Sequence, residues 1–193
     1  MTAPDQVYAF AFRGLLAEEA LDSAGRTPNK VTGFFDEDIA EVLSLDVLDE
    51  SAVQTAKQMA AVYTAIAAFE NSVRKLMSSR LLEESGDGWW ISTVPEKIRT
   101  AAKNRQDAES KIRWHTPRGD DPINYTDFGH LVSIIQNNWT MFEPYFRSVE
   151  WVRQIFDNLE RSRNVIMHSG VLAMVDIERI GMNIRDWVAQ VGD

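Results

Sequence analysis

The fold is decided by the stretch SVEWVRQIFDNLERSRNVIMHSG, residues 148–170. Its apolar residues recur at steps of three and four, which places them on one face of a helix. This apolar stripe consists of Val152, Ile155, Phe156, Leu159 and Ile166. Gly170 stands where a left-handed C-cap would end such a helix. The stretch therefore predicts an amphipathic helix that begins near Ser148 and carries residues 163–168 in its last turns.

Helical spacing continues on both sides of this stretch. The pattern of a capping box at Ser51 to Gln54 predicts the start of a long helix that ends near Gly86. A second capping box at Thr93 to Glu96, with Pro95 in the first turn, predicts the start of a basic helix. Residues 114–124 are rich in turn formers and are expected to form a loop.

Two more helices are predicted by the apolar spacing of residues 128–139 and 177–191. Period-two alternation is scarce, so the predicted fold class is all-α, a helical bundle over residues 51–193. Residues 1–50 are expected to form an acidic N-terminal helical extension, with helices near residues 7–16 and 39–43. These first 50 residues carry a net charge of -8, almost all of the net -9 of the chain.

Composition narrows the class of protein. Of the 193 residues, 45% are hydrophobic and 25% are charged, which are ordinary values for a globular protein. No apolar run is long enough to span a bilayer, and no basic leader precedes an apolar stretch. The absence of cysteine excludes disulfides and thiolate chemistry and fits a reducing compartment. We therefore expect a cytoplasmic protein without membrane segments.

The overall acidity argues against a nucleic-acid partner, but the charge is unevenly distributed. Residues 97–118 hold seven Lys and Arg against two acids, a local net of +5. Such a segment can steer a polyanion towards a site, or it can be a solvated helix face with no partner. On the first reading the RNA-binding candidates are Lys97, Lys103, Arg105, Lys111 and Arg113.

The candidate chemistry lies in the motif Arg163-Asn164-x-x-x-His168. Arg163 continues the apolar stripe at a position where a core would take an aliphatic residue. Asn164 and His168 are one turn apart and share a face rotated by roughly 100 to 140° from Arg163. One helix cannot make all three converge, whereas a two-fold pairing of two helices can, so the motif predicts a homodimer. The alternative is an ordinary ion-paired arginine and a helix-ending histidine.

An arginine, a polar residue, three further residues and a histidine near the end of a bundle helix resemble the motif of HEPN domains. The resemblance spans roughly residues 55–190 and is closest to the HEPN subfamily appended to an mRNA-surveillance endoribonuclease. The secondary matches are Phe69 to Arg74, Trp89-Trp90 and Tyr125 to Phe128. The resemblance implies a metal-independent ribonuclease of the toxin or phage-defence type, active as a dimer with both motifs at the interface.

The resemblance also implies roles for the motif residues. His168 would transfer protons at the ribose 2'-hydroxyl or the leaving oxygen, Arg163 would stabilise charge on the phosphate, and Asn164 would orient them. The implied partners are RNA such as tRNA, a second copy of the chain, and an antitoxin or defence-system protein, with no cofactor and no metal. Glu70 and Arg74 form an i,i+4 pair that is either a local salt bridge or a support for the site.

Two other functions remain open on the sequence. A catalytically silent HEPN module can serve as a scaffold for dimerisation or for a partner, which the acidity of the chain favours. A regulator that binds a nucleotide or RNA at the same interface would bind its ligand tightly without turnover. Cleavage of RNA that depends on His168 separates both from the nuclease.

Overall fold

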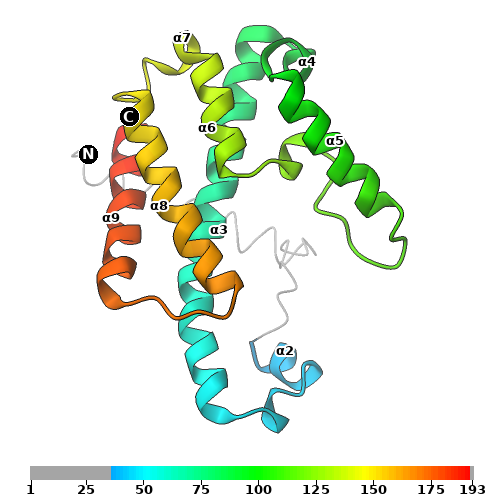
Figure 1. The fold of residues 1–193 in the computed structure, drawn as a ribbon, viewed down its shortest axis with the longest axis vertical. Coiled ribbons are helices and arrows are strands. Elements are labelled where there is room, and N and C mark those ends of the chain that lie inside the picture. The colour runs from blue at the N-terminus through cyan, green and yellow to red at the C-terminus, as the bar shows by residue number, and fades with distance from the viewer. Residues whose placement is uncertain (1–35, 192–193) are drawn as a thin grey trace, which may run out of the picture. The chain divides into compact units, whose positions relative to one another are not determined.

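The computed structural model describes residues 36–191, and every regular element within that range is helical (Figure 1). The predicted all-α class is therefore confirmed. In chain order the elements are α2 (Asp36–Val42), the 3-10 helix η1 (Leu45–Val47), α3 (Glu50–Ser85), α4 (Trp89–Thr93), α5 (Glu96–Ser110), the 3-10 helix η2 (Pro122–Tyr125), α6 (Phe128–Asn137), α7 (Trp139–Phe142), α8 (Val149–Met167) and α9 (Met174–Val191).

The chain divides into two compact units, residues 1–50 and 51–193. In the first unit the described elements are α2 and the 3-10 helix η1. The predicted helix near residues 7–16 lies outside the described residues. The assignment of residues 1–50 as a separate acidic helical extension stays a prediction.

The second unit is built around α3, whose buried residues follow one face at helical spacing, as predicted. They are Met59, Val62, Ile66, Phe69, Glu70, Val73, Met77 and Leu81. Against this face pack α6, α8 and α9, and α6 is in contact with α8 and α8 with α9 (Figure 1). Burial of each aliphatic or aromatic side chain contributes about 1.5 to 3 kcal/mol to folding. The one charged residue in the buried face of α3 is Glu70.

Aromatic rings join the helices at the centre of the core. Phe69 of α3 lies 5.8 Å from Phe156 of α8 and 5.4 Å from Trp187 of α9, both in edge-to-face contact. Phe128, the first residue of α6, lies 5.5 Å from Phe156. These contacts fix the start of α6 and the middle of α8 relative to the middle of α3, beside the candidate site.

Two predicted helix starts need correction. The long helix α3 begins at Glu50, so Ser51 lies inside its first turn and is not its cap. Pro95 is the N-cap of α5 and not a first-turn residue, and Thr93 closes the short helix α4 by donating to the carbonyl of Trp89 at 2.7 Å. The sequence did not separate α4 from α5, because five residues are too few for a periodic signal.

The decisive helix α8 begins as predicted. The Ser148 side chain caps it and accepts a hydrogen bond from the Trp151 amide at 3.1 Å. The predicted stripe is buried from Val152 to Leu159, while Ile166 is half-buried near the C-terminal end. In the described part of the chain, no helix is long and apolar enough to cross a membrane.

Candidate active site at the end of helix α8

The end of α8 carries a Schellman motif that places the motif histidine. His168 is the C-cap, and its amide donates to the carbonyl of Asn164 at 3.1 Å. The amide of Ser169 then donates to Ile166 at 2.9 Å and that of Gly170 to Val165 at 2.8 Å. The His168 side chain is exposed, and no hydrogen bond or ion pair joins it to any of the described residues.

The predicted left-handed cap at Gly170 is wrong by one position. Ser169 takes the left-handed conformation, with φ of 60°, and Gly170 follows it. Gly170 is needed for space instead: a Cβ there would lie 2.6 Å from the Val165 side chain and 2.8 Å from the Val165 carbonyl oxygen. The backbone after His168 thus turns tightly against the last turn of α8.

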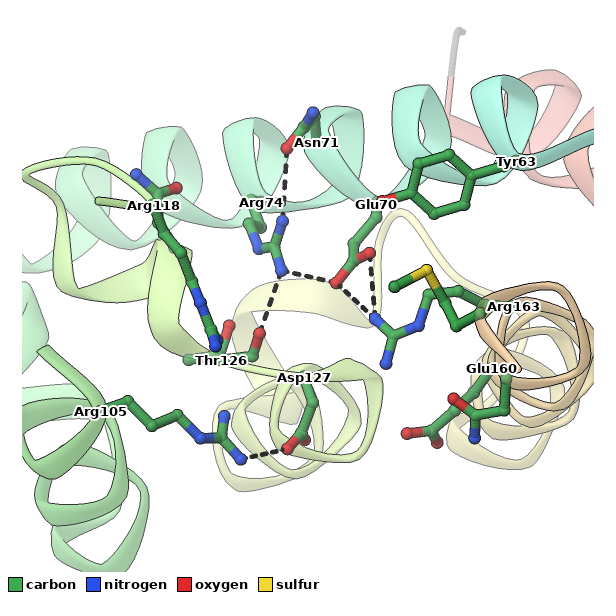
Figure 2. A pocket seen from close by; sticks show the side chains of 13 residues that line it. Tyr63, Glu70, Asn71, Arg74, Arg105, Arg118, Thr126, Asp127, Glu160 and Arg163 are labelled. Carbon is green, nitrogen blue, oxygen red and sulfur yellow. Dashed lines mark hydrogen bonds and ion pairs between the residues drawn. The ribbon is translucent and has the colours of Figure 1, made fainter. Parts of the chain in front are cut away.

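Arg163 lies on the other flank of α8, at the wall of a cavity of about 740 Å³ (Figure 2). The cavity is bounded by α3, α5, the loop before η2, the start of α6 and the last turns of α8. Its lining is mostly polar and consists of Tyr63, Glu70, Asn71, Arg74, Arg105, Arg118, Asn124, Thr126, Asp127, Glu160, Arg163, Asn164 and Met167. Four arginines and three carboxylates therefore face one space.

Glu70 connects two of these arginines. Its side chain is 10% exposed, and its carboxylate lies 2.5 Å from Arg74 Nη2 and 3.3 Å from Arg163 Nη1. Figure 2 shows Glu70 between the two guanidinium groups. Arg163 also lies over the Phe128 ring, 5.4 Å from its centroid, in a cation–π contact. The arginine that interrupts the apolar stripe of α8 is thus held by a buried carboxylate and an aromatic face.

Arg74 is held by more contacts than the i,i+4 ion pair with Glu70 alone would give. Besides Glu70 it donates to the carbonyl of Thr126 at 3.0 Å, and its Nε is buried with no hydrogen-bond partner. Burial lowers the pKa of the Arg74 guanidinium, Glu70 opposes this, and the charge of Arg163 lowers it further. Arg74 and Arg163 thus lie near enough to repel each other, and the Glu70 carboxylate between them offsets this repulsion.

Two carboxylates on the far side of the cavity differ in their electrostatic surroundings. Burial acts to raise the pKa of Asp127, but hydrogen bonds from Arg105 and from the His130 amide outweigh it and hold that pKa below its usual value. Burial raises the pKa of Glu160, and the charge of Asp127 adds to the shift while Arg163 opposes it. Asp127 is the N-cap of α6 and is held by Arg105 at 2.9 Å.

The structure brings together some of the predicted site residues and separates others. Arg163, Asn164, Glu70, Arg74 and Arg105 all line the cavity. His168 does not line it. The other RNA-binding candidates, Lys97, Lys103, Lys111 and Arg113, are exposed and lie outside the lining. Within one chain, the arginine and the histidine of the motif therefore do not share a site.

Three of the charged lining residues, Glu160, Asp127 and Arg118, were not predicted from the sequence as members of the site. Glu160 lies three positions before Arg163, so helical spacing alone could have placed it on the same face. Asp127 carries the sequence signal of an N-cap ahead of an apolar run. Arg118 lies in the loop, where no periodicity predicts its direction.

A second cavity, of about 640 Å³, adjoins the helix end that carries His168. It lies between the first half of α3 and the turn after α8, and shares Tyr63 and Met167 with the arginine-lined cavity. Its lining is mainly apolar and includes Ala56, Met59 and Val171. This lining is open to solvent, because Met167 and Val171 are 62% and 60% exposed. In the described residues, no group of three or more His, Asp or Glu is arranged to hold a metal ion.

The comparisons with known proteins give one finding. The family model described as Swt1-like HEPN matches residues 64–192, two thirds of the chain. The match contains the Glu70 network, the loop with Arg118 and the whole of α8 and α9. Neither curated proteins nor solved structures give a match.

Proposed function

This chain belongs to the Swt1-like HEPN family, and from that premise we propose that it is a metal-independent endoribonuclease. The observation that carries the proposal is the position of Arg163, a motif residue on the wall of a polar cavity that also holds Arg74, Arg105 and Arg118. Guanidinium groups bind phosphate in fixed geometry, and a cluster of them stabilises charge that grows on a phosphate during reaction.

The active form in this proposal is a homodimer. Arg163 faces the cavity while His168 is exposed at the helix end outside it, so one chain supplies only half of the motif to each site. A two-fold axis near the end of α8 would bring His168 of one protomer to Arg163 of its partner. The exposed side chains of Met167 and Val171 supply apolar surface beside that axis.

The proposed reaction uses the RNA itself as the nucleophile. The ribose 2'-oxygen attacks the adjacent phosphorus, the bond from phosphorus to the 5'-oxygen breaks, and the products are a 2',3'-cyclic phosphate and a 5'-hydroxyl. His168 takes the proton from the 2'-hydroxyl or gives one to the leaving oxygen. Arg163 stabilises the charge on the phosphate, and Asn164 hydrogen-bonds to the reacting groups. Glu70 acts as a positioning residue, because it touches Arg163 and not the substrate.

Family membership supports a role as a toxin or phage-defence effector, with tRNA as the first substrate to test and with an antitoxin or companion protein as partner. Expression from an inducible promoter tests this role. The native chain is expected to arrest growth, whereas the His168→Ala variant is not. Equal toxicity of the two chains would contradict it.

A second candidate function is a catalytically silent module for dimerisation or for binding of a partner or nucleotide. The observation that favours it is the pairing of Arg163 with Glu70. Nη1 of Arg163 already donates to the Glu70 carboxylate, so this nitrogen has a partner within the protein before any ligand binds. Such a module would keep its fold and its dimer in the Arg163→Ala variant and would never turn over RNA.

The deciding experiment is cleavage of purified tRNA by the full chain in EDTA. We expect the native chain to cleave tRNA and to leave a 2',3'-cyclic phosphate. The cleavage rate should fall by at least about a hundredfold in Arg163→Ala and in His168→Ala. It should be unchanged in Arg153→Ala. Arg153 is a matched control because it is an exposed arginine of the same helix whose only side-chain partner among residues 36–191 is Gln136. Cleavage that requires divalent metal, or that survives both motif variants, would refute the proposed mechanism.

A further inference from the structure

Three arginines from three separate segments converge on the short segment Tyr125–Asp127 at the left side of the cavity in Figure 2. Arg74 of α3 donates to the carbonyl of Thr126 at 3.0 Å, and Arg105 of α5 donates to the carbonyl of Tyr125 at 2.6 Å. Arg118, from the loop, lies over the Tyr125 ring at 5.9 Å. This end of the cavity is lined by a different set of residues from the motif on α8.

The loop that carries Arg118 is held in place. Glu109 at the end of α5 forms an ion pair with Nε of Arg118, at 2.6 Å, and accepts a hydrogen bond from the Arg118 backbone amide at 3.1 Å. The Tyr125 hydroxyl donates to the carbonyl of Gly119 at 3.0 Å. Gly119 has φ of 133°, and a Cβ there would lie 2.6 Å from the Asn124 amide nitrogen, so only glycine fits. The Arg118 side chain is thus presented at the rim from an ordered turn.

Arg118 differs from its neighbours in the donors that it leaves unused. The terminal nitrogens of Arg105 donate hydrogen bonds to Tyr125 and Asp127. Those of Arg74 donate to Asn71, Glu70 and Thr126. The pair with Glu109 uses only Nε of Arg118. Its two terminal nitrogens, the fork that binds an oxyanion, have no hydrogen-bond partner in the described part of the chain.

The charges of the cavity favour an anion at this end. Asp127 is neutralised by Arg105, and Glu70 is shared between two arginines. Arg118 is paired with Glu109, whose carboxylate lies 2.6 Å from Nε of the guanidinium. Arg74 and Arg105 are thus each paired with a carboxylate, whereas the terminal nitrogens of Arg118 have no hydrogen-bond partner among the described residues and can take a phosphate.

We propose that Arg118 binds the phosphate of the nucleotide next to the scissile one, in a subsite separate from Arg163, so that the ligand is a single-stranded RNA segment with at least two consecutive phosphodiesters. This inference rests on the proposed function, in which Arg163 takes the reacting phosphate. Arg74 and Arg105 act as positioning residues, because their terminal nitrogens donate to the protein and hold the segment Tyr125–Asp127 beside the subsite.

The test is equilibrium binding, which does not depend on turnover. Full-length His168→Ala protein is titrated against a fluorescein-labelled nine-nucleotide single-stranded RNA, with and without Arg118→Ala, across a range of salt concentrations. We expect Arg118→Ala to weaken binding about tenfold, as for one charge-assisted contact. The slope of log Kd against log salt should fall by about 0.7. Arg118→Lys should restore the salt slope, and Arg153→Ala should change neither quantity.

Arg118→Ala is expected to fold, because the side chain is 53% exposed and a single exposed ion pair contributes little to stability. A competition series locates the subsite: a trinucleotide with two phosphodiesters should lose affinity in Arg118→Ala, and a dinucleotide with one should not. Equal affinity of the native and variant proteins for the nine-nucleotide RNA overturns the inference, as does the absence of any RNA binding. Binding that depends on Arg118 in a protein that never cleaves RNA supports the subsite and refutes only the nuclease.

Discussion

The substitution Glu70→Gln isolates the charge that holds Arg163 in place. The side chain of Glu70 is 10% exposed and that of Arg163 24% exposed, so water screens this pair less than it screens a surface pair. Glutamine has nearly the shape of glutamate and keeps one acceptor oxygen, but it carries no charge. The change therefore leaves Arg74 and Arg163 facing each other without the carboxylate between them.

The magnitude follows from the two contacts of Glu70. Hydrogen bonds to charged groups contribute about 1.5 to 3 kcal/mol each, and the contact with Arg163, at 3.3 Å, falls at the weak end of that range. Because glutamine keeps one of the two contacts, we expect a loss of about 2 kcal/mol in the free energy of unfolding. For a chain of this size that corresponds to a fall in Tm of about 4 to 8 °C.

The assay is urea unfolding at fixed protein concentration, so that dimerisation contributes equally to every variant. Glu83→Gln is the matched control, because Glu83 also pairs with an arginine of α3, Arg80, but is 59% exposed. We expect the control to change stability by less than about 0.5 kcal/mol. A double-mutant cycle with Arg163→Ala should give a coupling energy of about 1 kcal/mol or more. Additive effects within about 0.3 kcal/mol would refute the network as described.

The other predictions concern local features of the site. Ser169→Gly should raise the free energy of unfolding in urea by about 1 kcal/mol, because serine occupies the left-handed position at the helix end. Gly170→Ala should lower it, because the added Cβ clashes with Val165. Changes of the opposite sign in the free energy of unfolding would contradict the described turn. Asp127→Ala should cost about 1 to 2 kcal/mol through loss of the cap, and Asp127→Asn clearly less. The raised pKa of Glu160 means that the folded state resists its ionisation, so stability is lost as pH rises above 4.5. Glu160→Gln should therefore be more stable than the native protein at about pH 8 and equal to it at about pH 4, as measured by unfolding at both values.

The helices could be predicted from the sequence because their apolar faces repeat at the period of the α-helix. The stripe from Val152 to Leu159 and the long stripe of α3 are both buried as expected. The ends of the helices were harder to predict than their interiors. A Schellman motif commonly has glycine in its left-handed position, but at the end of α8 serine takes this position and glycine follows it. Thus Gly170 signals the end of α8 correctly but for a different physical reason, its contact with Val165.

The candidate site was predictable only where it follows one helix. Arg163 and Asn164 were predicted from the sequence of α8 alone. Both line the cavity, although their positions are about 100° apart around the helix, because the cavity is wide enough to include both. The role of Glu70 depends on a partner 93 residues away, and that of Arg118 on the path of a loop. Neither contact has a periodic signal, because one depends on the packing of α3 against α8 and the other on the position of the loop at α5 and η2.

The central claim is that Arg163 and His168 act together across a dimer interface, and mixing two inactive variants tests it most directly. Arg163→Ala and His168→Ala proteins are unfolded together, refolded and assayed for cleavage of tRNA in EDTA. If each site takes its arginine from one protomer and its histidine from the other, half of the dimers carry one intact site, and about a quarter of the native activity should return. Recovery near that level supports the account, and a mixture that dimerises but stays as inactive as either variant alone would contradict it.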